Sequence, residues 1–335
     1  MKGRIKLTAL MPSLAMIAAL LTGLSALHWM AASPGKDGEV DVVIEPGQKL
    51  KGIADSLEKA GAIRSSLYFV WFARLKGDAK GIRAGEYMIP GNSSPGEVLD
   101  RLVHGRVFFR QVTIPEGKTL SEIAWVVEKA GIVSRDAFLH AAANTSGMEP
   151  WLSPGAPDLE GLLFPETYAY TRNTTAADFV KMMTTQFRRV FEPIWKDRDP
   201  TLTLKPYEAV ILASIIEKET GRADERPVVA AVFLNRLKQN MRLESDPTVI
   251  YGIPNFAGNL RRANLEKPTP YNTYTHAGLP VGPICNPGVA SIRAVMHPAQ
   301  NNLLYFVSKG DGTHQFSSSL AEHNAAVQLY QKGNR

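Results

Sequence analysis

An uncharged apolar segment opens the chain. Residues 7–32 contain no Asp, Glu, Lys or Arg, and these 26 residues exceed the about 20 that a helix needs to cross a bilayer. Every charged residue before the segment is basic: Lys2, Arg4 and Lys6. Because positive charge marks the cytoplasmic side, the pattern predicts one transmembrane helix, with the N-terminus inside and the chain after Ser33 outside. A cleaved signal peptide is the alternative.

The pattern that follows is a short strand, a turn and an amphipathic helix, and it occurs twice. Residues 42–63 align with residues 112–133 at a constant offset of 70, and the run Glu-Lys-Ala-Gly recurs in both. Alternating apolar residues predict the strand, and apolar residues at helical spacing predict the helix. Residues 87–105 form a looser third copy. We therefore predict a region of βα repeats over 40–133, after a Pro/Gly linker at 33–39.

Local signals in the second copy support this prediction. Pro115 and Gly117 indicate the turn. Thr119 and Glu122 form a capping box that starts the helix, and Gly131 ends it. These βα units resemble the LysM-like modules of wall-associated proteins, and the resemblance implies contact with glycans that contain N-acetylglucosamine. A rigid spacer is the alternative.

The remaining pattern is mainly helical. Residues 134–205 predict a helical connection, with a long amphipathic helix over 175–195. From Pro206 on, the sequence predicts three helices, at 206–221, 224–239 and 244–253. An irregular loop rich in Pro, Gly, Asn and Tyr follows at 268–288. The last predicted elements are a helix at 286–298, a hairpin at 303–317 and a closing helix at 319–331. In this pattern Asp246 is the N-cap of the third helix. Helices mixed with short strands predict an α+β fold class.

Composition narrows the function classes. The 335 residues carry a formal charge of +6 and a single cysteine, Cys285, so no intramolecular disulfide forms. No run of basic residues interleaves with aromatic ones, which argues against nucleic-acid binding. The seven histidines form no ligand cluster, and HExxH, P-loop and GxGxxG patterns are absent, so neither a metal site nor a nucleotide site is indicated.

Two glutamates end the helix predicted over 206–221. On a helical projection, Glu217 shares its side with the small residues Ala213 and Ser214, which leaves room for a ligand. Glu219 lies on roughly the opposite side, among larger aliphatic residues. The two side chains therefore diverge and cannot act as one carboxylate pair. A carboxyl group at the end of an apolar stripe suits a general acid, and Glu217 is the candidate.

Both glutamates also have structural interpretations. Glu217 can cap the helix end or pair with Lys218 or Arg222. Glu219 lies near the helix C-terminus, where negative charge is unfavourable unless it is paired, and Arg222 or Arg226 can pair with it. We interpret Glu219 as a structural or supporting residue.

The irregular loop supplies groups suited to sugar. Tyr271, Asn272 and Tyr274 combine flat aromatic faces with hydrogen-bonding groups that match pyranose rings, hydroxyls and acetamides. Asn235 sits near an apolar helix face and needs a partner. Asp246 is the one nearby carboxylate that can serve as a second catalytic acid. Cys285 has His276 near it in sequence, but no orienting partner is evident, so Cys/His catalysis is disfavoured.

Four segments together resemble the endolytic murein transglycosylases, the MltG or YceG-like family. They read LASIIEKET, VFLNRLKQNMRLESDPTVIYG, NLEKPTPYNTYTHAGLPVGPICNPG and HPAQNNLLYFVSKGDGTHQFS. The resemblance covers nearly the whole chain and is weakest in residues 1–40 and 134–160. It implies a lytic transglycosylase that cuts inside the glycan strands of peptidoglycan. The family's catalytic glutamate maps to Glu217.

The resemblance also implies how one carboxyl group suffices. Glycosidases that use water ordinarily need two. A lytic transglycosylase uses the C6 hydroxyl of N-acetylmuramic acid as an internal nucleophile and leaves a 1,6-anhydro end, with no metal or cofactor. In this reading Glu217 is the general acid and base. The residues Tyr271, Asn272, Tyr274, Asn235 and Asp246 bind or orient the glycan, as hypotheses.

The family further implies a setting and partners. The expected location is the cytoplasmic membrane, with a single pass and the active domain outside. The expected partners are peptidoglycan glycan strands, peptidoglycan synthases and membrane lipid. The predicted organisation begins with a cytoplasmic tail (1–6), a transmembrane helix (7–32) and a linker (33–39). The LysM-like repeat region (40–133), a helical connection (134–205) and a catalytic domain (206–335) follow.

Two other functions compete with this one. The first is a wall-binding scaffold with no catalytic activity. The second is a lysozyme-type hydrolase that uses Glu217 together with Asp246 and leaves reducing ends.

Overall fold

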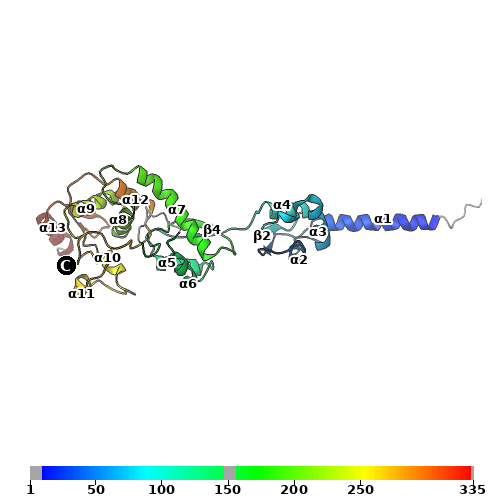
Figure 1. Ribbon diagram of the computed structural model, residues 1–335, viewed down its shortest axis with the longest axis horizontal. Helices are drawn as coiled ribbons and strands as arrows, with labels where there is room; N and C mark the ends of the chain where they lie inside the picture. The colour runs from blue at the N-terminus through cyan, green and yellow to red at the C-terminus, as the bar shows by residue number, and fades with distance from the viewer. Residues whose placement is uncertain (1–9, 147–155, 333–335) are drawn as a thin grey trace, which may run out of the picture. The chain divides into compact units, whose positions relative to one another are not determined.

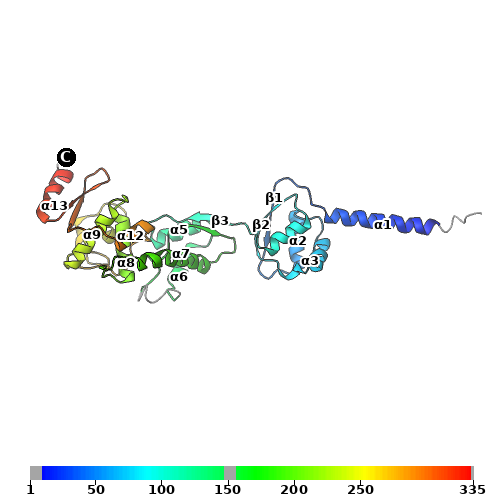
Figure 2. The same cartoon turned by 90° about the horizontal axis from the view of Figure 1, so that it is seen from above.

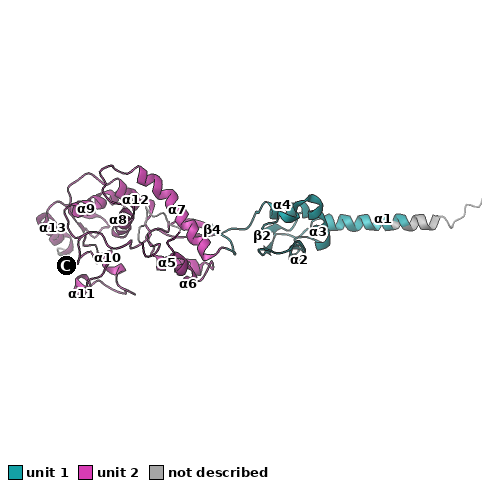
Figure 3. Ribbon diagram, viewed as in Figure 1, with its two compact units in different colours: residues 1–110, 169–173 teal, residues 111–168, 174–335 magenta. Residues whose placement is uncertain are grey.

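The computed structural model describes residues 10–146 and 156–332. It divides the chain into two compact units (Figure 3). Unit 1 comprises residues 1–110 and 169–173, and unit 2 comprises residues 111–168 and 174–335. The predicted repeat region ran to residue 133, but the second repeat copy packs with unit 2 instead.

Unit 1 holds a long helix followed by small helices and one two-stranded sheet (Figure 1). Its elements are α1 (Leu10–Ala31), β1 (Glu39–Ile44), α2 (Leu50–Ala60), α3 (Ser66–Lys76), a 3₁₀ turn η2 (Asp78–Lys80), β2 (Gly85–Pro90) and α4 (Pro95–Val103). The antiparallel pair β1–β2 runs from Glu39 opposite Pro90 to Ile44 opposite Gly85. The core beneath it is aliphatic and aromatic, and Leu57, Phe69 and Tyr87 are fully buried.

The sequence prediction for residues 7–32 is not confirmed. No helix within residues 10–146 and 156–332 is long and apolar enough to cross a membrane. The first three residues of the predicted segment, 7–9, lie outside the described residues.

The strand–turn–helix prediction is confirmed for all three copies, which form β1–α2, β2–α4 and β3–α5. In the second copy, Thr119 accepts a hydrogen bond from the Glu122 amide and the Glu122 carboxylate accepts one from the Thr119 amide, as the capping box predicts. Gly131 follows the helix with φ +70°, a conformation that favours glycine.

Unit 2 is mainly helical. Its helices are α5 (Leu120–Lys129), α6 (Arg135–Ala142), α7 (Ala176–Lys196), α8 (Pro206–Glu219), α9 (Arg226–Lys238), α10 (Asp246–Tyr251), α11 (Arg262–Glu266), α12 (Val289–Met296), α13 (Leu320–Val327) and a π-helical turn η3 (Gln328–Lys332). Its hairpin is β5 (Tyr305–Ser308) and β6 (His314–Ser317). Two more strands are divided between the units: β3 (Arg110–Thr113) has its first residue in unit 1, and β4 (Thr167–Tyr170) has its last two residues there. Helices α8, α9 and α12 pack together at its centre (Figures 1 and 2). The predicted long helix, hairpin and closing helix are confirmed.

Three details of the C-terminal prediction differ from the structure. β4 pairs with β3 inside the stretch predicted as a helical connection. The short helix α11 was not predicted. Asp246 is the first residue of α10 rather than its N-cap, which is Ser245, and no side chain there makes a capping bond.

Helix α8 is buried on all sides, as its sequence predicts. Its residues from Ala209 to Ile216 are all buried, with α12 along one side and α9 along another. Pro206 occupies the first turn, where a missing N–H costs nothing. The two glutamates at the end of α8 are therefore held in place by a well-packed helix.

A buried carboxyl group joins three segments of unit 2. Glu160 is 4% exposed and accepts hydrogen bonds from the Leu120 amide (2.9 and 3.0 Å), the Tyr251 hydroxyl (3.0 Å) and Asn286 Nδ2 (2.8 Å). Burial raises the pKa of Glu160 to about 8, and these donors oppose that rise. The start of α5, the end of α10 and the loop before α12 thus meet at one residue.

Glu160→Ala should destabilise unit 2 strongly. The substitution leaves buried donors on Leu120 and Asn286 without partners, at about 1–3 kcal/mol for each. Urea unfolding followed by circular dichroism measures the loss. Glu166→Ala, at an exposed glutamate of the same segment, is the control and should change stability little. Equal stability of the two variants would contradict this role for Glu160.

Candidate active site

Glu219 is the last residue of α8 and lines a cavity of about 360 Å³. The wall of this cavity comes from the ends of α8, α9 and α10, the irregular loop, the hairpin and the C-terminal helix. Its polar side chains include Glu219, Arg236, Glu244, Asp246, Tyr274 and His314. We call this space the Glu219 cavity.

The environment of Glu219 favours the protonated acid. Burial raises the pKa of Glu219 to about 7, and the negative charge of Asp246 adds to the rise. The hydrogen bond that the Ser245 hydroxyl donates to Glu219 Oε1 opposes it, as do the charges of His314 and Arg236. A carboxylic acid with a pKa near neutrality can both donate and accept a proton at physiological pH.

Tyr274 and Asp246 form one wall of the Glu219 cavity. The Tyr274 hydroxyl donates a hydrogen bond to Asp246 Oδ1 at 2.7 Å. Asp246 is exposed, and its second carboxylate oxygen has no hydrogen-bond partner within the described residues. This wall presents an aromatic face beside an available acceptor, which is a combination that suits a sugar ring.

His314 also lines the cavity and is fixed by Glu225. Its ring Nδ1 is 2.7 Å from Glu225 Oε2, and its backbone amide donates to Glu225 Oε1 at 2.9 Å. Both side chains are nearly buried. Because Nδ1 is paired with a carboxylate, the other ring nitrogen, Nε2, is left to interact with the cavity.

Glu217 is placed differently from the prediction. Its Oε2 accepts hydrogen bonds from the Gly288 amide at 3.0 Å and the Ser291 hydroxyl at 2.7 Å. Its Oε1 faces Arg226 Nη2 at 3.8 Å, and the Glu217 side chain is 7% exposed. Glu217 thus caps the start of α12 from outside that helix, and it is not among the residues that line the Glu219 cavity.

A second carboxyl group crowds Glu217. Burial and the charge of Glu217 raise the pKa of Glu116. A Cβ on Gly288 would come within 2.0 Å of the Glu116 carboxylate, which would have to move to make room for it. Glu217, Glu116 and Arg226 therefore form a packed ionic cluster beneath the turn of the second repeat copy.

The room expected beside Glu217 is filled by protein. Ser214 is fully buried, and its hydroxyl accepts a hydrogen bond from the Ile284 amide at 3.0 Å. The Cys285 thiol approaches the Ser214 carbonyl at 3.3 Å. Small residues on this face of α8 make space for the loop before α12, not for a ligand. The room for a ligand that the sequence predicts beside Ala213 and Ser214 is occupied here by Ile284 and Cys285.

Two predicted glycan-binding residues are held by the backbone. Asn272 is fully buried, and its Nδ2 donates to the carbonyls of Leu265 and Lys267 at 3.0 and 2.7 Å. Asn235 Nδ2 donates to the carbonyls of Asn301 and Leu303, both at 3.0 Å. Each amide closes a loop of its own, and neither lines the Glu219 cavity.

Tyr271 and Cys285 also lie outside that cavity. The Tyr271 ring packs edge-on against Tyr251, with ring centroids 4.8 Å apart. Cys285 is buried, and burial raises the pKa of its thiol well above the usual range, so it holds its proton at neutral pH. Of the predicted site residues, the structure therefore brings together Glu219, Asp246 and Tyr274.

Sequence reasoning missed four residues at this site, namely Ser245, Arg236, His314 and Glu225. His314 is separated by 95 positions from Glu219, and only the folded hairpin brings it to the end of α8. The buried Arg236 donates to the carbonyls of Leu304, Arg242 and Leu243 and so braces the floor. The sequence contains one indication of Arg236, because this charged residue stands in an apolar run of the segment VFLNRLKQNMRLESDP.

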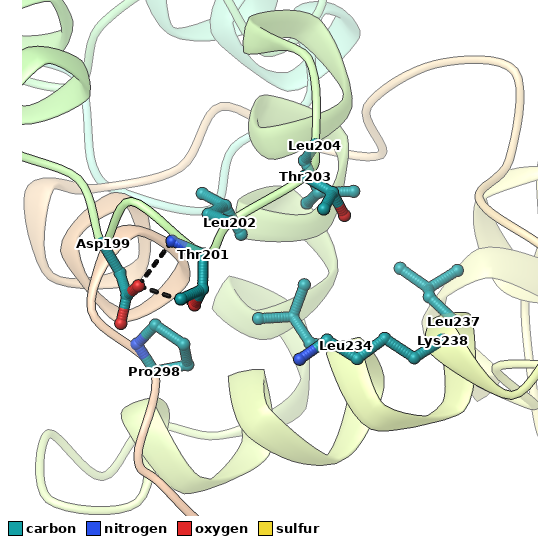
Figure 4. Close-up of a pocket in the computed structure, with 9 residues that line it drawn as sticks. All are labelled: Asp199, Thr201, Leu202, Thr203, Leu204, Leu234, Leu237, Lys238 and Pro298. Atoms are coloured by element: carbon teal, nitrogen blue, oxygen red, sulfur yellow. Dashed lines mark hydrogen bonds between the residues drawn. The ribbon is translucent and has the colours of Figure 1, made fainter.

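Two other cavities within the described residues have different linings. One of about 130 Å³ is lined mostly by aliphatic and threonine side chains, and the carboxylate of Asp199 there accepts bonds from Thr201 (Figure 4). Another of about 680 Å³ lies beside α10 and includes Glu160, whose carboxyl group is already fully bonded. No group of three or more His, Cys, Asp or Glu side chains within the described ranges is arranged to hold a metal ion.

The fold and the site together define an α+β protein with a carboxylic acid of raised pKa in an open cavity, the arrangement of an enzyme that uses general acid catalysis. A model of the YceG-like family matches residues 42–329. The chain belongs to the YceG-like family.

Relatives and a solved structure agree with this assignment. The chain is 31% identical over 307 residues to an endolytic murein transglycosylase of Bacillus subtilis, covering 87% of this chain and 84% of that protein. It is 28% identical over 322 residues to the endolytic murein transglycosylase of Streptococcus pneumoniae strain D39, covering 86% of this chain and 58% of that longer protein. A crystal structure of a YceG-like protein from Listeria monocytogenes superposes with a TM-score of 0.58 and 27% identity, covering 87% of this chain and all of that one.

Ser245→Ala should raise the pKa of Glu219 further. The variant removes the hydroxyl that stabilises the ionised carboxylate, and burial and Asp246 remain. A titration of the ¹³C carboxyl shift of Glu219 measures the change. Ser291→Ala removes the matching hydroxyl from Glu217 and should leave the Glu219 titration in place. A lowered or unchanged pKa in Ser245→Ala would show that the hydroxyl does not stabilise the carboxylate.

Proposed function

We propose that this protein is a lytic transglycosylase that cuts within the glycan strands of peptidoglycan, with Glu219 as its general acid and base. The names of its relatives support the enzyme class and the murein substrate. One observation carries the choice of residue. Of the two glutamates at the end of α8, Glu219 lines an open cavity and has a pKa near 7. Glu217 Oε2 accepts two hydrogen bonds from the start of α12, and its Oε1 lies 3.8 Å from Arg226.

The proposed reaction needs a single carboxyl group. Protonated Glu219 donates its proton to the glycosidic oxygen, and the bond from that oxygen to C1 of N-acetylmuramic acid breaks. The C6 hydroxyl oxygen of the same sugar then bonds to C1, and its proton passes to the Glu219 carboxylate. The product carries a 1,6-anhydro end and Glu219 is again protonated, so no water is consumed.

Neighbouring groups support this cycle. The Ser245 hydroxyl orients the Glu219 carboxyl group and stabilises its ionised form between the two proton transfers. Tyr274 and Asp246 present a face for the sugar that bears the C6 hydroxyl. His314, fixed by Glu225, lines the same space. We retain Asp246 and Tyr274 as glycan-contacting residues and assign Glu217, Asn235 and Asn272 to the framework.

Glu219→Gln should abolish anhydro-ended products, because removing a general acid costs about 10²–10⁴ in rate. Glu217→Gln should keep activity wherever it folds, since its role is to cap α12. Mass spectrometry of fragments from purified glycan strands measures both variants, and thermal melts report on folding. Loss of activity in a folded Glu217→Gln variant, with activity retained in Glu219→Gln, would return the catalytic role to Glu217.

The pH dependence of kcat/KM should follow the same group. The free enzyme must hold the proton on Glu219, so kcat/KM should be constant well below the pKa of about 7 and fall about tenfold per pH unit above it. Initial rates on glycan strands between pH 5 and pH 9 test this. A rate that rises through pH 7 would mean that the essential group acts first as a base.

A lysozyme-type hydrolase is the second candidate, because Asp246 lines the same cavity as Glu219. It would use Asp246 as the second carboxylate and leave reducing ends. The same mass spectra separate the two. Reducing ends from the native chain, and complete loss of activity in Asp246→Asn, would favour the hydrolase.

We also propose that the protein is attached to the outer face of the cytoplasmic membrane. There it would act next to the synthases that make nascent peptidoglycan strands. The support is the basic residues before residue 7 and the apolar side chains that α1 exposes. Those side chains are Met16, Ile17, Leu20, Leu21, Leu24, Leu27 and Trp29. Glycan contact by the LysM-like βα units stays a proposal as well, and the βααβ order of β1, α2, α3 and β2 is what supports it.

A further inference from the structure

Helix α3 of unit 1 carries an apolar stripe that no described residue covers. Leu67, Trp71 and Leu75 are spaced by four residues, so they lie on one side of the helix. They are 79%, 56% and 70% exposed. The opposite side of the helix is ordinary core, where Phe69 and Ala73 are fully buried. Three large apolar side chains in a row at such exposure mark a contact surface.

The surroundings of this stripe are basic. Arg74 is exposed and follows Trp71 by three positions, so it lies on the same side of α3. Between residues 64 and 83 the chain has five basic residues and one acidic residue, Asp78. A helix with Trp and Leu on its outer side and Arg and Lys beside them matches an anionic lipid surface, where Trp sits at the headgroup level.

Helix α3 also contacts α1 within unit 1 (Figure 1). The Arg64 guanidinium, just before α3, lies over the Trp29 ring of α1, 5.2 Å from its centroid. The exposed apolar side chains of α1 extend as far as Trp29, two residues before the helix ends. Exposed apolar side chains therefore occur on two helices of unit 1 that contact each other.

The chemistry of the stripe favours lipid over sugar. A sugar site pairs an aromatic face with amides or carboxylates that bind hydroxyls. Leu67 and Leu75 flank Trp71 with groups that make no hydrogen bonds. We propose that α3 lies on the anionic surface of the membrane, with Leu67, Trp71 and Leu75 in the headgroup region. This inference rests on the proposed membrane attachment, and it fixes which side of unit 1 faces the bilayer.

Tryptophan quenching by brominated lipid tests the proposal with the full chain. The protein is mixed with vesicles of phosphatidylglycerol and phosphatidylcholine whose acyl chains carry bromine near the headgroups. Trp29→Phe is the starting variant, because it removes the tryptophan on α1 and leaves four of the five. Trp71→Phe and Trp125→Phe are then added separately. Trp125 on α5 of unit 2 is 55% exposed and is the matched control.

We expect quenching in Trp29→Phe that is lost when Trp71→Phe is added and kept when Trp125→Phe is added. Arg74→Gln, and vesicles of phosphatidylcholine alone, should each weaken it. Equal quenching in the two double variants would contradict the proposal. Quenching that changes neither with lipid charge nor with Arg74→Gln would also contradict it.

Sedimentation with the vesicles tests the proposed membrane attachment separately from the proposed role of α3. If the protein sediments with vesicles but no quenching is assigned to Trp71, membrane attachment is supported and the role of α3 is contradicted. Protein that stays in solution overturns both. A stripe covered by a second copy or by glycan would give the first of these results.

Discussion

Burial of one carboxyl group sets the geometry on which the candidate site depends. Glu160 collects donors from the start of α5, the end of α10 and the loop before α12. Since α10 is only six residues long, fixing Tyr251 at its end also fixes Asp246 at its start. Glu217 adds a second constraint by capping α12. Buried carboxyl groups therefore hold the framework around α8, and Glu219 is the carboxyl group of α8 that faces the cavity.

Much of the fold was predictable, because it follows local rules. The capping box at Thr119, the αL glycine at Gly131 and the apolar periodicity of α7 and α8 act within one turn or one helix. The family assignment was also within reach, since it rests on segments that are continuous in the sequence. Element boundaries and the short elements β4 and α11 were less accessible, because their pairing and packing depend on distant residues.

The sequence and the family resemblance favoured Glu217 as the general acid, whereas the cavity and the raised pKa lead us to propose Glu219. The helical projection separated them correctly, and it also gave the correct small and large sides of α8. It could not say what fills the space beside the small side, which is the chain around Ile284 and Cys285. Likewise, Asn272 and Asn235 have the right chemistry for sugar, but their amides are used by backbone carbonyls that only the folded chain brings near.

The raised pKa of Glu219 changes how many molecules are ready to react at any moment. An exposed glutamate, with a pKa of about 4.3, holds its proton in roughly one molecule in five hundred at pH 7. With a pKa of about 7, close to half of the molecules hold it. In the proposed mechanism, burying the end of α8 therefore enlarges the population that holds this proton by about two orders of magnitude. The protonated fraction also changes most steeply with pH near neutrality, so the proposed activity responds to small changes in the pH of the medium.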